Sequence, residues 1–282
     1  MIHDDRFDDL PAWRIDLPHG QAHVSAHGGQ LLSWRPQDGE DVFWCSPITR
    51  RPPQAIRGGV PICWPYFGRQ GQPPDAVQHG HARISPWQFI DARADGDDVV
   101  IDLALPPHAH TPLRLRQRLR FGADTLVQTL VSENPSDAAV TLTQALHSYF
   151  AVGDVRGVRL DGLEGCLYED KIRGGRHRQD APWRLEAIEG DAACDRIYAT
   201  TTPRFVLRDP VRSRRLVLET RGSRSLVLWN PRAAGAAIPD LPAQGWQGFL
   251  CVETANAGDD VITLQPGGEH RLSQRVTVAP LD

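Results

Sequence analysis

Two side chains of this 282-residue sequence have the chemistry for proton transfer near neutral pH, and the first is Glu253. In the segment FLCVETAN, strand alternation places Glu253 on one face with Phe249 and Cys251, while Leu250 and Val252 make the other face apolar. A carboxylate on a strand that is buried on both faces needs a partner. The pattern therefore predicts either a structural ion pair with an arginine or a functional carboxylate with a shifted pKa.

The second side chain is His147, which follows the apolar strand AVTLTQAL and begins the segment HSYF. A single histidine beside aromatic residues is more often a hydrogen-bonded core or rim residue than a catalytic one. Its meaning changes with a carboxylate partner, because His and Glu together supply an acid and a base near neutral pH. The pairing of His147 with Glu253 is therefore a hypothesis for the structure to test.

A third region dense in constraints is QAIRGGVPICWPYFG (54–68). Gly58 and Gly59 permit backbone angles that other residues avoid, so we expect Arg57 to precede a fixed turn. The aromatic residues that follow suit the wall of a sugar pocket, although an aromatic core is the more common explanation; they are Trp64, Tyr66 and Phe67.

The motif QHGHAR (78–83) places His79 and His81 one residue apart and ends on Arg83. His-x-His is a pattern that binds metals. A cupin-like metal site also needs a glutamate a few residues later, and the next glutamate is Glu133. We therefore expect no metal site.

Composition excludes several other classes of function. Lys171 is the only lysine among the 31 basic residues, so a Schiff-base mechanism depends on it alone, and anions must be met by arginine, histidine or backbone amides. The formal charge of −4 gives no basic footprint for nucleic acid. The sequence also lacks G-x-S-x-G, Walker A and G-x-G-x-x-G motifs, so we expect no cofactor.

The expected location is the cytoplasm, without membrane attachment. No run of 18 apolar residues is present, and the N-terminus MIHDDRFDDL is acidic and lacks the apolar core of a secretory signal. The five cysteines form no C-x-x-C pair, and Cys63 and Cys251 lie in apolar runs typical of core residues.

The elements that must position these residues are β-strands nearly throughout. LRLRQRLRF (113–121) alternates leucine with arginine, which predicts a half-buried antiparallel strand with a solvated arginine face. The other expected strands are 99–105, 125–131, 139–146, 215–220, 225–230, 249–254 and 271–278. We expect an all-β, two-sheet sandwich in a single domain over 1–282, with a short N-terminal extension of about 1–11.

Several of these segments occur together in one known family. RGGVPICWPYFG, QHGHAR, HSYF, DRIY (195–198) and LVLWNP…FLCVETAN resemble the aldose 1-epimerase superfamily, and most closely its hexose-6-phosphate branch, over about residues 20–278. The resemblance implies a galactose-mutarotase-like β-supersandwich with the active site in a cleft on one sheet. It also implies an isomerase that interconverts the α and β anomers of a sugar phosphate such as glucose 6-phosphate. We expect the protein to be a monomer.

The resemblance also assigns residues. The catalytic pair corresponds to His147 and Glu253, and His79 is an additional sugar contact. The residues that contact the sugar phosphate correspond to Arg57, Gln78, Arg83 and Asp195. The sequence departs from the family at His81, where an aromatic residue is usual; this matters for substrate preference if residue 81 stacks on the sugar and not if it packs in the core.

Two alternatives remain open at this point. One is an epimerase of unphosphorylated aldoses, against which Arg57 and Arg83 argue. The other is a carbohydrate-binding domain without turnover, against which the presence of both His147 and Glu253 argues.

Overall fold

Strands dominate the chain, as the sequence predicts. The computed structural model describes residues 2–36, 39–188 and 190–282. Within these ranges the helices are short 3-10 turns: η1 (Ala82–Ile84), η2 (Leu185–Ala187), η3 (Arg232–Ala237) and η4 (Gly245–Gly248). No helix in the described part of the chain is long and apolar enough to span a membrane. The all-β prediction is confirmed.

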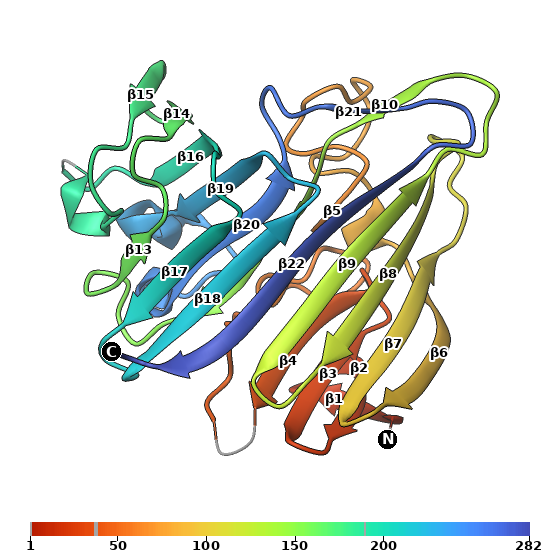
Figure 1. Cartoon of the computed structure of the whole chain (residues 1–282), viewed down its shortest axis with the longest axis horizontal. Helices are drawn as coiled ribbons and strands as arrows, with labels where there is room; N and C mark the ends of the chain where they lie inside the picture. The colour runs from red at the N-terminus through yellow and green to blue at the C-terminus, as the bar shows by residue number, and fades with distance from the viewer. Residues whose placement is uncertain (1, 37–38, 189) are drawn as a thin grey trace.

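Two eight-stranded antiparallel sheets share the main hydrophobic core (Figure 1). The β22 sheet runs in the order β13 (Arg159–Asp161), β17 (Arg204–Asp209), β18 (Arg214–Arg221), β22 (Glu269–Pro280), β9 (Thr125–Glu133), β8 (Arg114–Phe121), β7 (Asp98–Leu105) and β6 (Gln88–Asp95). The β20 sheet runs in the order β15 (Arg176–Arg178), β14 (Leu167–Asp170), β16 (Cys194–Ala199), β19 (Ser225–Asn230), β20 (Phe249–Asn256), β11 (Gln144–Leu146) and β5 (Ile62–Cys63), and β12 (Tyr149–Ala151) also pairs with β20.

Two smaller sheets complete the sandwich. A four-stranded sheet contains β1 (Ile2–Phe7), β2 (Leu10–Leu17), β3 (Gly20–Ser25) and β4 (Gln30–Pro36). A two-stranded sheet pairs β10 (Val140–Leu142) with β21 (Ile262–Leu264). Residues 2–7, which the sequence analysis places in an N-terminal extension, thus pair with β2.

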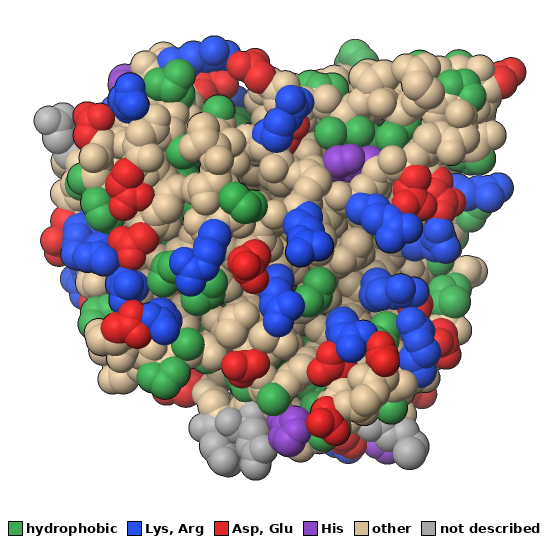
Figure 2. All heavy atoms as spheres, in the orientation of Figure 1, with side chains coloured by type: hydrophobic (Ala, Val, Ile, Leu, Met, Phe, Trp, Pro, Cys, Tyr) green, Lys and Arg blue, Asp and Glu red, His purple; other side chains and the backbone are tan. Residues whose placement is uncertain are grey.

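The arginine row of β8 lies on the solvated face, as predicted. The leucines of this strand are buried against the core, whereas its arginines form ion pairs across to neighbouring strands. Figure 2 shows basic and acidic side chains interspersed over this face of the molecule. The pairs are Arg116–Glu133, Arg118–Asp102 and Arg120 with Asp95 and Asp98.

One predicted strand is interrupted in the structure, so the prediction of a continuous strand is wrong. The run 139–146 is expected as a single strand, but it divides at Thr143 into β10 and β11. The backbone N–H of Thr143 donates to the carbonyl of Pro65, so the chain leaves the two-stranded sheet there and joins the β20 sheet. All five cysteines are free, and Cys63 and Cys251 are fully buried, as expected of core residues.

Candidate active site

Glu253 and His147 face each other because of the register of three strands. β20 is buried along its whole length, and Glu253 is 1% exposed. On the neighbouring path, Leu146 at the end of β11 pairs with Thr254, and Tyr149 at the start of β12 pairs with Cys251. His147 lies in the interruption between β11 and β12, so this register brings it opposite Glu253.

The two side chains form a close pair with unsatisfied atoms. His147 Nε2 lies 3.4 Å from Glu253 Oε1. His147 Nδ1 and Glu253 Oε2 are buried and have no hydrogen-bond partner in the described part of the chain. Buried polar atoms are seldom left unpaired in native proteins, so this arrangement is suited to a polar ligand that completes it.

Burial sets the proton balance of the pair. It raises the pKa of Glu253 well above the usual value, an effect to which Asp195 adds and which Arg83 opposes. Burial also lowers the pKa of His147 well below the usual value, and the nearby His79 and Arg83 lower it further. Both shifts favour the neutral form of each side chain, so a state with one proton on the pair is favoured over a state with two or none.

Arg57 is held rigidly beside this pair. Its Nε donates to Asp240 Oδ1 at 2.8 Å and its Nη1 donates to the Tyr149 hydroxyl at 3.2 Å, while Nη2 has no partner among the described residues. Tyr149 in turn stacks on His147, with ring centroids 4.9 Å apart and an interplanar angle of 11°. The Nη2 group of Arg57 is therefore available to a ligand, and Arg57 contacts His147 indirectly, through Tyr149.

The expected glycine turn after Arg57 is present. Gly58 and Gly59 have φ of 115° and 59°, and a Cβ at Gly59 would lie 2.2 Å from the carbonyl oxygen of Leu31. Only glycine fits such a position without displacing the backbone.

Arg83 differs from most arginines of the chain because it has no carboxylate partner among the described residues. Its Nη2 donates to the carbonyl of Gln78 at 3.0 Å, and its Nε is buried without a partner. Arg57, Gln78 and Arg83 line one hollow of about 450 Å³, together with Asp240 and Arg50. The structure thus brings together three of the residues predicted to contact a sugar phosphate.

His79 presents a fixed hydrogen-bond donor to the site. Its Nδ1 accepts from the backbone N–H of Gly68 at 3.2 Å, so the proton of the neutral ring resides on Nε2. Burial and the nearby Arg83 lower the pKa of His79 to about 3, which keeps the ring neutral at physiological pH. The ring lies 6.0 Å from that of His147, centroid to centroid.

Asp195 lies on the same face of the β20 sheet, across β19 from β20. It pairs with Trp229, which pairs with Cys251. Its carboxylate makes no hydrogen bond or ion pair with the described residues, and burial raises its pKa to about 6. Asp195 is thus a largely buried acceptor near Glu253, as a residue that binds sugar hydroxyls requires.

The two histidines of QHGHAR point to different surroundings. His81 is buried, packs edge-on against Trp64 and stacks on His108 at 3.7 Å. It therefore belongs to the core, and its departure from the family pattern has no direct consequence for the sugar. The described residues contain no group of three or more His, Cys, Asp or Glu side chains arranged to hold a metal ion.

The aromatic residues that follow Arg57 also lie in different surroundings, some in the core and some near the site. Trp64 is 1% exposed and donates its Nε1 hydrogen to Ser132 Oγ within the core. Phe67 is half-buried and packs edge-on against the His79 ring.

Two residues of the site are missing from the sequence prediction. Tyr149 stands two positions after His147, and period-two alternation would have placed it on the same face. Asp240 gives no comparable signal, because it lies 183 positions from Arg57 in a loop.

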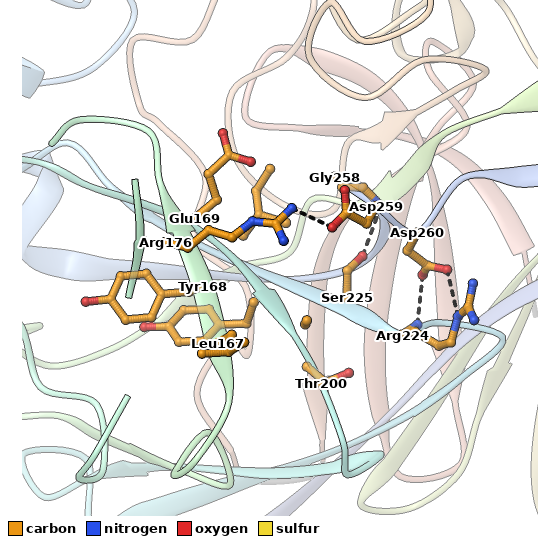
Figure 3. A pocket seen from close by; sticks show the side chains of 14 residues that line it. Leu167, Tyr168, Glu169, Arg176, Thr200, Arg224, Ser225, Gly258, Asp259 and Asp260 are labelled. Atoms are coloured by element: carbon orange, nitrogen blue, oxygen red, sulfur yellow. Dashed lines mark hydrogen bonds and ion pairs between the residues drawn. The ribbon is translucent and has the colours of Figure 1, made fainter. Parts of the chain in front are cut away.

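A second hollow, of about 370 Å³, opens between the β14–β15 hairpin and the loop after β20 (Figure 3). Ion pairs line it: Arg176 with Asp259 at 2.6 Å and Arg224 with Asp260 at 3.2 Å. It contains none of the predicted site residues.

The chain is similar to known proteins over almost its whole length. An Escherichia coli K12 protein named "Putative glucose-6-phosphate 1-epimerase" is 32% identical over 294 residues, which cover 97% of this chain and 92% of that protein. The crystal structure of "a putative mutarotase" from Salmonella typhimurium matches with a TM-score of 0.88 at 30% identity, covering 99% of this chain and 94% of the other.

The fold expected from the resemblance is also confirmed. A galactose mutarotase-like protein from Clostridium acetobutylicum has the same fold at 14% identity, with a TM-score of 0.76 over 100% of this chain and 99% of the other. Residues 11–277 match the family described as aldose 1-epimerase. The chain therefore belongs to the aldose 1-epimerase family.

Proposed function

We propose that the chain interconverts the α and β anomers of an aldohexose 6-phosphate, with glucose 6-phosphate as the first substrate to test. The observation that carries this proposal is the arrangement of Arg83, a half-buried guanidinium without a carboxylate partner among the described residues, beside the His147–Glu253 pair. A fixed, unpaired guanidinium is well suited to a phosphate because it binds two oxygens at once.

The proposed reaction is a balanced pair of proton transfers. Glu253 as carboxylate takes the proton of the anomeric hydroxyl, while protonated His147 donates a proton to the ring oxygen. The C1–O5 bond breaks and a C1 carbonyl forms, which leaves both side chains neutral, the state that burial favours. After rotation about C1–C2, the same steps in reverse close the ring on the other face of the carbonyl.

The neighbouring residues have complementary roles in this proposal. Arg57 and Arg83 bind the phosphate, and the fixed Nε2–H of His79 donates to a sugar oxygen. Asp195 and Gln78 orient sugar hydroxyls. No step needs a metal or a cofactor, so activity should survive exhaustive treatment with EDTA; its loss, with recovery on adding a divalent ion, would contradict the mechanism.

The test compares anomerisation of glucose 6-phosphate and of glucose by saturation-transfer NMR. Arg83→Ala should lower kcat/KM for glucose 6-phosphate by more than about thirtyfold, which corresponds to about 2 kcal/mol, because a charge contact to the phosphate is lost. The rate for glucose should change little. Equal losses on both sugars would support an epimerase of unphosphorylated aldoses, and no turnover of either sugar would support a binding domain.

A further inference from the structure

Three buried glutamines form a row on the core-facing side of the β22 sheet. Gln117 of β8, Gln128 of β9 and Gln274 of β22 are each 1% exposed or less, on strand faces that are mostly apolar. These three strands are neighbours in the β22 sheet (Figure 1). A buried amide is unfavourable unless its hydrogen bonds are satisfied, so such a row needs a reason.

The hydrogen bonds of the row have one direction. Gln117 Nε2 donates to the carbonyl of Gly29 at 2.6 Å, Gln128 Nε2 donates to Gln117 Oε1 at 2.6 Å, and Gln274 Nε2 donates to Gln128 Oε1 at 3.1 Å. The side-chain oxygens of Gln117 and Gln128 are therefore each occupied by the amide of the next glutamine. The last free acceptor is Gln274 Oε1, which faces the β20 sheet.

That oxygen accepts from two hydroxyls next to the candidate catalytic pair. Ser148 Oγ donates to it at 2.9 Å, and Thr254 Oγ1 donates to it at 3.4 Å. Ser148 follows His147 and Thr254 follows Glu253 in the sequence. Gln274 Oε1 of the β22 sheet is thus hydrogen-bonded to both segments that carry the candidate catalytic residues.

The segment that contains His147 is less regular than the strands on either side of it. β11 ends at Leu146 and β12 begins at Tyr149, so His147 and Ser148 lie outside the regular ladder. Three backbone hydrogen bonds also hold this segment: the N–H of His147 donates to the carbonyl of Pro61, that of Ser148 to the carbonyl of Leu146, and that of Val252 to the carbonyl of Ser148. None of these three bonds connects the segment to the β22 sheet.

We propose that Gln274 is a positioning residue for the His147–Glu253 pair, acting through Ser148 and Thr254. The proposal rests on the proposed function for its kinetic meaning. If the glutamine row served only to satisfy polar groups in the core, loss of any member would reduce stability without a particular effect on the pair. If Gln274 positions the pair, its loss should reduce kcat specifically.

The experiment compares Gln274→Leu with Gln117→Leu, a matched control at the opposite end of the row. Gln274→Leu should lower kcat for glucose 6-phosphate by about tenfold or more, with KM within about twofold, because small displacements of catalytic groups strongly affect rate. Gln117→Leu should keep kcat within about twofold, although both variants lose thermal stability.

A second comparison covers the case in which Gln274→Leu does not fold. Thr254→Val removes the hydroxyl and keeps the shape, so it should lower kcat about tenfold, whereas Thr254→Ser keeps the hydroxyl and should restore most of the rate. Unchanged kcat in Gln274→Leu, or the same loss in Gln117→Leu, would overturn the proposal. So would equal rates for Thr254→Val and Thr254→Ser.

A readout without substrate separates this proposal from the proposed function. The ring resonances of His147, followed by NMR in the free protein, should shift in Gln274→Leu and stay in place in Gln117→Leu. If wild type anomerises neither sugar, the proposed function fails and this spectrum alone decides the role of Gln274. An unchanged His147 spectrum in a folded Gln274→Leu variant would reject it.

Discussion

At the residue scale, the central feature is a carboxylic acid and an imidazole that lie in close contact in a buried site. Their atoms lie 3.4 Å apart in a buried setting, and each has one further polar atom without a partner. Neither residue alone supplies both halves of the proposed reaction, because ring opening needs a base at the anomeric hydroxyl and an acid at the ring oxygen.

Because both residues act in one proposed step, substitutions at Glu253 and His147 should cause non-additive losses of activity. Glu253→Gln should retain less than about a hundredth of wild-type activity, because an amide cannot act as a base, and His147→Asn should be similarly damaging. The double variant should be little worse than either single variant, because the two residues act in one step. Saturation-transfer NMR on variants with wild-type circular dichroism checks this expectation. A single variant that keeps more than about a tenth of the rate, or fully additive losses, would contradict it.

Asp240 provides a second prediction at this scale. It accepts from Arg57 Nε and fixes the orientation of the guanidinium relative to the hollow. Asp240→Ala should raise KM for glucose 6-phosphate about tenfold, whereas Asp240→Asn keeps an acceptor oxygen and should stay within about threefold of wild type. Rates for glucose should not change. If both variants lose equally, the charge of Asp240 and not its hydrogen bond is what matters to Arg57.

At the scale of elements, alternation predicts the regular strands and fails where strands are interrupted. β8 and β20 are found where the sequence places them because each has a continuous face against the core. The division at Thr143 and the gap at His147 depend on partners in β5 and β21, which are distant in the sequence. Local patterns contain no information on such partners.

The same limit applies to the site. Glu253 and His147 are recognisable as candidates because Glu253 lies within an apolar strand and His147 follows one, and the family resemblance pairs them. The ion pair of Arg57 with Asp240 and the bonds of Gln274 to Ser148 and Thr254 link segments that share no local pattern. They arise only when the loops and the two sheets are assembled.

The loop that carries Gln78, His79 and Arg83 depends on Gly80. It has φ of 69°, and a Cβ there would lie 2.1 Å from the carbonyl oxygen of Trp64. Gly80→Ala should therefore displace the loop, lower the melting temperature and reduce activity by more than about tenfold, since binding groups move together.

Gly71→Ala is the matched control, because Gly71 has φ of 70° and nothing within 4 Å of an added Cβ. It should lose only the about 1–2 kcal/mol associated with a left-handed backbone at a residue with a side chain. Equal losses of stability and activity in the two variants would show that the close approach to Trp64 is unimportant.

At the scale of the whole molecule, the candidate site should reduce stability. Burial raises the pKa of Glu253 above its usual value of 4.5, so the folded protein keeps a proton that the unfolded chain releases. The unfolded state therefore binds fewer protons than the folded state above pH 4.5, and wild-type stability falls as pH rises through the folded pKa. Glutamine does not titrate and avoids this loss.

Glu253→Gln should accordingly be more stable than wild type at pH 8, and the difference should shrink toward pH 4. It can grow by at most about 1.4 kcal/mol per pH unit. Urea unfolding at pH 4, 6 and 8 measures it, with Glu219→Gln on β18 as a surface control, because that side chain is 50% exposed and its ion pair with Arg275, at 3.9 Å, contributes little to stability. A Glu253→Gln variant less stable than wild type at pH 8 would mean that the folded protein compensates the carboxylate fully. Glu253 would then have a structural role, and its Oε2 would not be the free acceptor that the proposed substrate binding requires.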